Sequence, residues 1–595
     1  MPDSETHTVK EADAAAAAGA SRVWARPHVV VPLALYALVT WLTNAFYMGD
    51  TYFYSSVVAR VLGGESYHIA EDIGLYSLWD FGHLLWRPLG VLVFPLARPL
   101  AHASVGADLN PAVTYMFVAL NWLAGLSSVG LLYGVLRRVC DKTWAVNVTI
   151  VAFIFAQAFL NYTQTGCSYI PSLSLLLLGI YLLVRDGERV ERPVLTALLA
   201  ALALTGAVGL WVPFVWVVPA AVATPLLLFG WQSGQRWRLS VYASLAFGLF
   251  TAALFIGVAL SIGIYTVGDF KGWIVSASHQ IGGNRGIPQV AFGFARSFIN
   301  MGNDNVDFKR YLLADPYSPV SLTDLFRLSL WKIALFYLFI AAILVNLLRT
   351  PFGRRLLAWL ALSGVPVFAF AFIWQGTVME RYVPWFPFLF PALAYALAER
   401  RAFRFAKALA LVFIAVMVWT NFGAMRKGAL ARHESAITER VRELQPLVSP
   451  QGIVFVGKDE LENFVRDYPF NPVNHHNDLR VYSFLQLGMP QAAAWQADVA
   501  RRTLDAWRAG GEVFVSRRVW AERPRREWDW VEGADPRVRW ADVYAFFTQL
   551  ETGRAVGGED GFVLVARTPK NEQLLSRVAA PETAADDSAA RERIR

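Results

Sequence analysis

The sequence carries little charge for its length, and this shortage excludes a class of protein. Charged residues make up 17% of the 595 residues, whereas hydrophobic residues make up 55%, and the mean hydropathy is +0.38. A soluble globular chain carries about 25% charged residues. The composition therefore excludes a soluble protein and predicts a polytopic membrane protein.

Cysteines and the common catalytic motifs are also scarce. Cys140 and Cys167 fall on opposite predicted sides of the membrane and lack zinc-ligand spacing, which excludes a disulfide framework and a zinc site. The sequence has no internal repeat, no Walker loop, no G-x-G-x-x-G motif opening a helix and no nucleophile elbow. ATP-driven and hydrolase functions therefore lack their motifs.

The sequence does contain eleven apolar runs of the length that an α-helix needs to cross about 30 Å of hydrocarbon. They are residues 29–47, 112–136, 144–164, 169–184, 193–210, 211–230, 239–265, 330–348, 356–374, 382–398 and 406–422. We therefore predict a polytopic α-helical membrane protein with about eleven transmembrane helices.

The arginines and lysines between these runs set the predicted orientation. They precede the first run and then concentrate in every second short loop, around residues 137–138, 185–192, 236–238, 349–355 and 400–407. Positively charged loops stay in the cytoplasm. The N-terminus is therefore predicted to be cytoplasmic in the plasma (inner) membrane, with loops 48–111 and 266–329 and the C-terminal region outside. The same loops account for the net charge of +8 without any nucleic-acid partner.

One further apolar run, residues 84–100, is not counted as a span. It contains Arg87, Arg98 and three prolines, and counting it would invert every later loop and break the charge rule. We predict a helix that lies at the outer membrane interface.

The segments outside the membrane differ from one another in composition. Residues 1–22 and 570–595 are predicted to be disordered tails, the first of them cytoplasmic. Residues 23–422 form the predicted transmembrane domain, and residues 423–569 form a small extracytoplasmic α/β domain.

Within that α/β domain we expect one helix and three strands. The helix is predicted at residues 429–447, and the strands at 452–457, 512–516 and 561–566. Each predicted strand is a short run of β-branched and aromatic residues next to glycine.

Charged residues gather where the apolar runs meet the predicted outer face. Asp50 follows the first run directly, and His83 and Arg87 return to the same boundary in the sequence His83-Leu84-Leu85-Trp86-Arg87-Pro88. The head group of a phosphorylated lipid can lie only at such a boundary. A carboxylate and a cation placed there suit an enzyme that handles such a lipid.

The order of these features resembles the GT-C superfamily, the integral-membrane glycosyltransferases that use polyprenyl-phosphate sugars. The resemblance covers residues 25–422 and is strongest to the branch of protein O-mannosyltransferases and lipid A aminoarabinose transferases. It rests on the acidic residue after the first span, the His-x-x-x-Arg-Pro sequence, about eleven spans and the late Glu380-Arg381-Tyr382-x-Pro-x-x-Pro sequence. The spacing leaves open whether His83 or Arg87 holds the cationic position of the family.

The resemblance implies a role for each of these residues. Asp50 is expected to be the general base that takes the proton of the acceptor hydroxyl; the alternative is a turn or helix-end aspartate. Arg87, Arg381 and His83 are expected to bind the donor phosphate; the alternative for the arginines is interfacial snorkelling. Residues with a possible role in substrate binding are Glu71, Asp72, Lys271, His279, Arg285, Glu380 and Tyr382.

The predicted function is therefore glycosyl transfer, of a hexose or a pentose. The sugar moves, with inversion, from a polyprenyl-phosphate donor to an extracytoplasmic protein, lipid or glycan. No metal site and no cofactor is predicted, although Glu71 and Asp72 leave a divalent cation open. The alternatives are a transporter or flippase, which usually carries ionisable residues inside its spans, and a non-catalytic sensor or scaffold.

Overall fold

The chain divides into two compact units in a computed structural model. The structure describes residues 27–43, 50–63, 78–105, 109–188, 192–276, 286–302, 321–399, 403–431, 444–449, 451–456, 480–483, 495–517, 540–557 and 561–579. One unit is helical and is built from residues 1–104, 113–306 and 322–430. The other consists mainly of residues 431–595.

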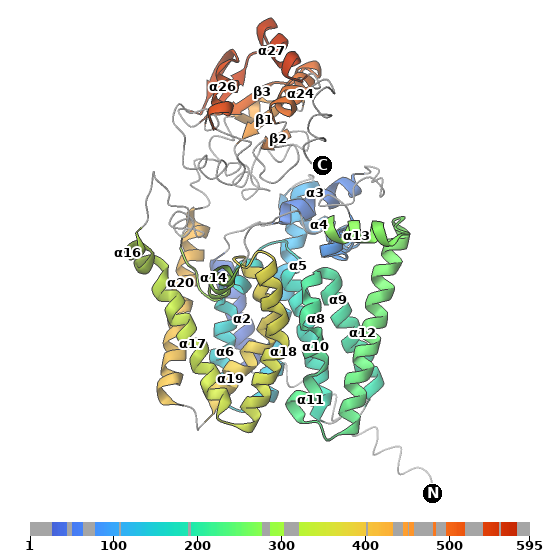
Figure 1. Cartoon of the computed structure of the whole chain (residues 1–595), viewed down its shortest axis with the longest axis vertical. Helices are drawn as coiled ribbons and strands as arrows, with labels where there is room; N and C mark the ends of the chain where they lie inside the picture. The colour runs from blue at the N-terminus through green and yellow to red at the C-terminus, as the bar shows by residue number, and fades with distance from the viewer. Residues whose placement is uncertain are drawn as a thin grey trace, which may run out of the picture. The chain divides into compact units, whose positions relative to one another are not determined.

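The helical unit is a bundle of long apolar helices with shorter helices at one end (Figure 1). Its α-helices are α2 (Pro27–Leu42), α3 (Thr51–Leu62), α4 (Trp86–Val105), α5 (Leu109–Val139), α6 (Thr143–Phe155), α7 (Gln157–Tyr162), α8 (Tyr169–Glu188), α9 (Pro193–Leu210), α10 (Val218–Val222), α11 (Thr224–Phe229), α12 (Gly234–Ser261), α13 (Val267–Ser276), α14 (Ile287–Phe298), α16 (Leu322–Leu325), α17 (Trp331–Leu348), α18 (Pro351–Ile373), α19 (Phe386–Ala398) and α20 (Arg404–Ala431). The unit also contains three 3₁₀ helices, η1 (Phe81–His83), η2 (Val212–Val217) and η5 (Met379–Trp385), and one π-helical turn, η4 (Phe326–Leu330).

Eight stretches of the described chain are long and apolar enough to cross a membrane. They coincide with eight of the eleven predicted runs, which confirms the polytopic α-helical class. The other three runs form shorter helices. α2 is described only to Leu42, the run 144–164 is divided at Ala156 into α6 and α7, and α19 has 13 residues after the 3₁₀ turn η5.

The helix is interrupted at Ala156, and the bundle supplies hydrogen-bond partners for the backbone groups that this interruption leaves without one. Ala156 has φ −58° and ψ 128°, which ends α6. The Asn421 side-chain amide of α20 donates to the carbonyl oxygens of Phe155 and Phe298, each at 2.6 Å. Backbone polar groups inside a membrane must find hydrogen-bond partners within the protein. The Asn421 amide is such a partner for the last carbonyl groups of two helices, α6 and α14.

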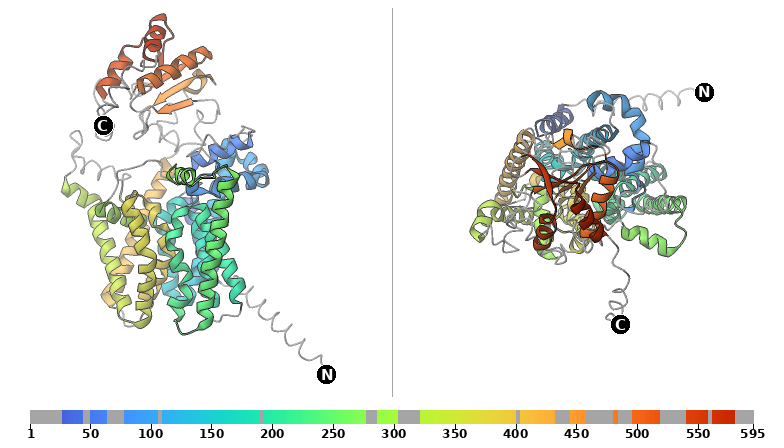
Figure 2. Two further views of the ribbon diagram at one scale, coloured as in Figure 1. Left: turned by 45° about the vertical axis from the view of Figure 1, so that its right-hand side comes forward. Right: turned by 90° about the horizontal axis from the view of Figure 1, so that it is seen from above.

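α3, α4 and α13 lie across one end of the bundle (Figure 2). α4 covers the run 84–100, and it is not among the eight stretches that could cross a membrane. Leu92, Leu96 and Leu100, spaced four residues apart on α4, expose 73%, 84% and 77% of their surface. One apolar stripe facing outward is the pattern of a helix that lies in the membrane interface.

The second unit contains a five-stranded sheet with the strand order β2-β1-β3-β5-β4. Its strands are β1 (Ile453–Val456), β2 (Arg480–Ser483), β3 (Val513–Ser516), β4 (Thr552–Val556) and β5 (Phe562–Val565). β1 is parallel to β2 and β3, whereas β5 is antiparallel to β3 and β4.

Helices cover one face of this sheet because alternate strand residues point to it. Ile453 and Phe455 of β1 and Val513 and Val515 of β3 pack in one core with α24 (Trp495–Arg508), α26 (Trp540–Thr548) and α27 (Pro569–Ala579). Val454 and Phe514 point to the opposite face and pack against Leu444 and Val448.

Three features of this unit differ from the sequence prediction. The three predicted strands are present as β1, β3 and β5, but the edge strands β2 and β4 were missed because their sequences lack the apolar pattern. The prediction of a disordered tail from residue 570 is wrong for the residues of α27, whose Leu575 is fully buried. The sequence analysis missed this amphipathic helix because the segment 570–595 as a whole is rich in charged residues. Of the helix predicted at 429–447, residues 432–443 lie outside the described part of the chain.

The pH dependence of this second unit should follow Glu512. Its Oε2 accepts hydrogen bonds from the Ser449 backbone N–H at 2.8 Å and the Ser449 hydroxyl at 2.6 Å. Partial burial raises the pKa of Glu512, but the Ser449 bonds outweigh this effect and hold the pKa below its usual value. A carboxyl with a lowered folded-state pKa stabilises the fold above its unfolded pKa, and this stability is lost as the pH falls through the folded pKa.

We therefore expect β1 and β3 to lose protection from hydrogen exchange between about pH 6 and about pH 3.5. The loss should correspond to no more than about 1 kcal/mol, because solvent screens a partly exposed carboxylate. Mass spectrometry of residues 451–456 and 511–517, corrected for intrinsic exchange rates, measures it. Glu512→Gln should show equal protection at both pH values, and a loss in this variant as large as in wild type would contradict the assignment.

A second prediction concerns the contact of α14 with the turn before η5. A Cβ atom on Gly293 would meet the carbonyl oxygen of Gly376, which belongs to rigid backbone. We expect Gly293→Ala to destabilise the protein by about 1–3 kcal/mol, as overpacking does. The thermal unfolding midpoint in detergent measures this, with Gly257→Ala as the control because a Cβ there meets nothing within 4 Å. An equal midpoint for both variants would contradict the close contact.

Candidate functional site

Asp50 precedes α3 at the end of the bundle where α2 finishes. It occupies the N-cap position of α3, but its side chain makes no capping hydrogen bond. Its Oδ2 instead accepts a hydrogen bond from the Tyr169 hydroxyl at 2.8 Å. Tyr169 is buried, whereas Asp50 is exposed. The carboxylate is therefore held by the start of α8 and remains open to solvent.

His83 is buried between two hydroxyl groups. Its Nδ1 lies 2.7 Å from the Ser168 Oγ, and its Nε2 lies 3.0 Å from the Tyr54 hydroxyl. Either neutral tautomer satisfies both contacts, because each hydroxyl can donate or accept. The His83 ring is thus fixed between α3 and the turn that precedes α8.

Arg87 is fully buried in the first turn of α4. Its Nη2 lies 3.6 Å from Oδ2 of Asp80, and its guanidinium carbon lies 5.4 Å from the centre of the Tyr54 ring. A snorkelling arginine would extend to the interface, so snorkelling does not describe Arg87. Asp80, which also caps η1 by accepting from the Gly82 N–H at 3.1 Å, was missed in the sequence.

Tyr54 is the residue that brings His83 and Arg87 together. Burial raises the pKa of Tyr54 well above its usual value, and the nearby Asp50 raises it further, while Arg87 acts in the opposite direction. The hydroxyl therefore stays protonated at neutral pH. The sequence left open whether His83 or Arg87 occupies the cationic position, and the structure places both against one tyrosine.

Glu380 and Arg381 begin the 3₁₀ turn η5 on another part of the chain. The Glu380 Oε2 accepts a hydrogen bond from the Tyr162 hydroxyl at 2.5 Å. The Arg381 Nη2 donates to the Gln375 Oε1 at 3.0 Å and lies 3.9 Å from the Glu380 Oε1. Both charged side chains are largely buried, with exposed fractions of 8% for Glu380 and 12% for Arg381.

Three aromatic rings surround the guanidinium of Arg381. The centres of Trp211, Phe370 and Trp374 lie 5.7, 5.8 and 5.8 Å from its central carbon. A guanidinium near aromatic faces is stabilised without losing its charge. Its Nε is buried and has no hydrogen-bond acceptor in the part of the chain that the structure describes.

Aromatic contacts join these groups into one site. The Tyr169 ring lies 4.9 Å from Tyr162 and 4.6 Å from Trp211, and 6.1 Å from His83. Asp50 and His83 therefore share one tyrosine, which contacts the residues that hold Glu380 and Arg381. The sequence analysis missed Tyr162 and Tyr169. Both tyrosines flank the short loop 165–168, which joins two predicted spans at the outer boundary. This position in the sequence could have identified them.

The other predicted site residues fall elsewhere. The Tyr382 hydroxyl donates to the backbone oxygens of Val290 at 2.9 Å and Gly376 at 2.6 Å, so it fixes the turn before η5. Lys271 is exposed on α13. The predicted residues that lie outside the described part of the chain are Glu71, Asp72, His279 and Arg285.

No group of three or more His, Cys, Asp or Glu side chains in the described ranges could hold a metal ion. Glu71 and Asp72, for which the sequence analysis kept a divalent cation as a possible ligand, lie outside the described part of the chain. The charges that the described site does contain are two arginines, each beside one carboxylate, and the exposed carboxylate of Asp50. This arrangement suits an anion and a group that exchanges a proton.

Comparison with known proteins connects the fold to solved structures. ArnT from Cupriavidus metallidurans bound to undecaprenyl phosphate is similar with a TM-score of 0.50 and 12% identity, over 91% of this chain and 98% of that chain. ArnT in the apo state gives a TM-score of 0.48 and 13% identity, over 95% and 100%. The archaeal oligosaccharyltransferase AglB from Archaeoglobus fulgidus gives a TM-score of 0.46 and 11% identity, over 91% and 75%.

These matches concern structure alone. No protein-family model and no curated protein matches the sequence. ArnT is a lipid A aminoarabinose transferase of the GT-C superfamily, and at 12% identity the similarity establishes the fold. The chain therefore shares the fold of ArnT, and this is the fold that the resemblance of its boundary motifs led us to expect.

The buried bond between Tyr162 and Glu380 yields a prediction for stability. Tyr162→Phe removes the hydroxyl that donates to the Glu380 carboxylate. We expect a loss of about 1.5–3 kcal/mol, since a hydrogen bond to a buried charged group is strong. Tyr265→Phe is the control, because Tyr265 is 76% exposed.

A double-mutant cycle of unfolding midpoints with Glu380→Gln isolates this contact. The effects of Tyr162→Phe and Glu380→Gln should be non-additive. Additive effects would show that the two side chains do not interact.

Proposed function

We propose that this protein is a membrane glycosyltransferase that moves a sugar from a polyprenyl-phosphate donor to an acceptor hydroxyl on the extracytoplasmic side. Asp50 is the general base, and the donor phosphate binds at the guanidinium groups of the same site, those of Arg381 and Arg87. The end of the bundle that carries α3, α4 and α13 faces outward, in accordance with the distribution of loop arginines.

The observation that carries this proposal is the environment of Asp50. The carboxylate is exposed, but one of its oxygens is held by the buried Tyr169 hydroxyl. Its Oδ1 makes no hydrogen bond to any residue that the structure describes, so it can accept one from an acceptor hydroxyl. A general base must be oriented and within hydrogen-bond reach of the proton that it takes.

Arg381 is the stronger candidate for the donor phosphate. Arg87 is completely buried, whereas Arg381 keeps 12% of its side chain exposed. Each guanidinium lies just beyond hydrogen-bond distance of its carboxylate, at 3.6 Å for Arg87 and Asp80 and 3.9 Å for Arg381 and Glu380. The aromatic surroundings of Arg381 lower the local dielectric constant, which strengthens its attraction for an anion. The structure of ArnT with undecaprenyl phosphate supports a lipid phosphate as the ligand of this fold.

The proposed reaction is one in-line displacement. The acceptor oxygen gives its proton to Asp50 and forms a bond to the anomeric carbon of the sugar. The bond between that carbon and the phosphate oxygen breaks, and its electron pair leaves with the lipid phosphate. Fixed guanidinium groups stabilise the charge that grows on the phosphate. One displacement inverts the configuration at the anomeric carbon.

The test is the rate of sugar transfer by purified protein in liposomes, measured by product mass with a panel of polyprenyl-phosphate sugars. We expect Asp50→Asn to lower the rate by about 10²- to 10⁴-fold, because it removes the base, and to leave the unfolding midpoint unchanged. Asp269→Asn is the matched control, since Asp269 is an exposed carboxylate on α13 at the same end of the bundle.

Two results would overturn the proposal. Equal transfer by wild type and Asp50→Asn would remove Asp50 from the reaction. Movement of the lipid-linked sugar between the two leaflets, with no transfer to any acceptor, would identify a flippase instead of an enzyme.

A further inference from the structure

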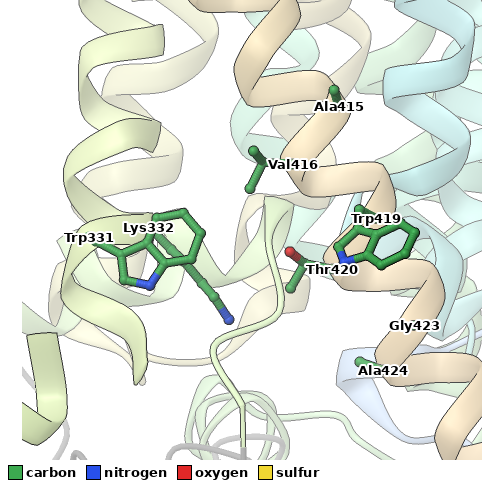
Figure 3. A pocket seen from close by; sticks show the side chains of 8 residues that line it. All are labelled: Trp331, Lys332, Ala415, Val416, Trp419, Thr420, Gly423 and Ala424. Atoms are coloured by element: carbon green, nitrogen blue, oxygen red, sulfur yellow. The ribbon is translucent and has the colours of Figure 1, made fainter. Parts of the chain in front are cut away.

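A groove between α17 and α20 lies outside the site around Asp50 (Figure 3). It has a volume of about 700 Å³ and is lined by Trp331, Lys332, Ala415, Val416, Trp419, Thr420, Gly423 and Ala424. It lies at the same end of the bundle as Asp50, because Arg426, farther along α20, donates to the Leu42 carbonyl oxygen at 2.7 Å. Pockets of this volume commonly hold small molecules.

Most of the groove surface is apolar, and two tryptophans border it. Trp331 is 36% exposed and Trp419 is 83% exposed. Tryptophans at helix ends mark the interface between lipid tails and head groups. The groove therefore opens toward the region of the bilayer where lipid head groups lie.

Lys332 differs from a lysine that snorkels to water. It is 9% exposed, and its Nζ donates to the Asn300 carbonyl oxygen at 2.9 Å. Figure 3 shows its amine between the two indole rings, in the space between the helices. An ammonium group has three N–H donors, and no carboxylate of the described residues forms an ion pair with this one.

Thr420 adds a second polar group on the opposite wall. Its hydroxyl makes no hydrogen bond with any residue in the described ranges, and its side chain lines the groove (Figure 3). A nearly buried cation and a hydroxyl thus face one apolar groove from two helices. A charge in such surroundings is costly unless an opposite charge pairs with it.

We propose that this groove binds the head group of an anionic phospholipid from the surrounding bilayer. The lipid phosphate accepts hydrogen bonds from the Lys332 ammonium and the Thr420 hydroxyl, and an acyl chain lies against Ala415 and Val416. Basic pockets between transmembrane helices bind anionic lipid head groups on the cytoplasmic side of membranes, and the same charge-assisted contacts serve an anionic lipid of the other leaflet. The net negative charge selects such lipids over zwitterionic ones, whose own ammonium group offsets the phosphate.

The experiment is native mass spectrometry of the whole protein in detergent, titrated with phosphatidylglycerol and with phosphatidylcholine of the same acyl chains. Wild type should bind the first lipid about tenfold more tightly, as expected for one charge-assisted contact. Lys332→Met should abolish this preference. Lys427→Met, which removes an exposed cation three residues beyond the groove on α20, should retain it.

A second variant tests the groove without touching the buried lysine. A Cβ on Gly423 meets no atom within 4 Å, so Gly423→Leu projects into open space and improves helix propensity. It should reduce phosphatidylglycerol binding about tenfold. Equal binding of the two lipids by wild type, or unchanged binding in both Lys332→Met and Gly423→Leu, would overturn the proposal.

Discussion

The short turn between α7 and α8 holds together the elements that form the site. The Gly166 N–H donates to the Thr51 Oγ1 at 2.7 Å, and the Gly166 carbonyl accepts from the Trp86 indole at 2.9 Å. The Cys167 carbonyl accepts from the Asn121 side chain at 2.6 Å. A buried turn must satisfy its backbone groups, and this one does so with side chains from α3, α4 and α5. Each of those helices is thereby fixed relative to α8.

The same turn presents the polar side chains that orient the charged residues. Ser168 contacts His83, and Tyr169 donates to Asp50. Asp50 is thus placed by a residue 119 positions away in the sequence, and not by the helix that it precedes. An exposed carboxylate would otherwise rotate freely, whereas the general base that we propose Asp50 to be needs one orientation before its substrate arrives. The turn therefore links the folding of four helices to the geometry of one functional group.

Hydropathy and loop charge predicted the parts of the molecule that depend on local sequence. The long spans and the strands β1, β3 and β5 follow from apolar runs. Asp50, His83, Arg87, Glu380 and Arg381 were selected because each lies at the predicted outer membrane boundary and in a motif of the GT-C resemblance. The residues that connect them could not be found in this way. Tyr54, Tyr162 and Ser168 matter through contacts between segments that are apart in the sequence, such as the 218 positions between Tyr162 and Glu380. Asp80 lies only seven residues from Arg87, but no apolar run or motif singled it out. α27 was missed for a different reason, since its four apolar residues, Leu574, Leu575, Val578 and Ala579, lie in a C-terminal segment, residues 570–595, that is otherwise rich in charge.

The two arginines of the site differ in how the protein holds them. Arg87 is wholly buried with its Nη2 3.6 Å from the Asp80 Oδ2, whereas Arg381 keeps 12% of its side chain exposed and lies 3.9 Å from the Glu380 Oε1. Arg381 is held by the neutral Gln375, the one non-glycine residue among those described that has a positive φ, at 49°. Such a conformation costs about 1–2 kcal/mol for an L-residue, and it persists only where the surroundings enforce it. Here they do, because Tyr382 donates to the carbonyl of the adjacent Gly376, which packs against α14. The fold thus maintains a strained turn that orients Arg381 through a neutral amide. A carboxylate in the place of that amide would add a second negative charge beside Arg381, besides that of Glu380, and would weaken its attraction for the lipid phosphate that we propose it binds.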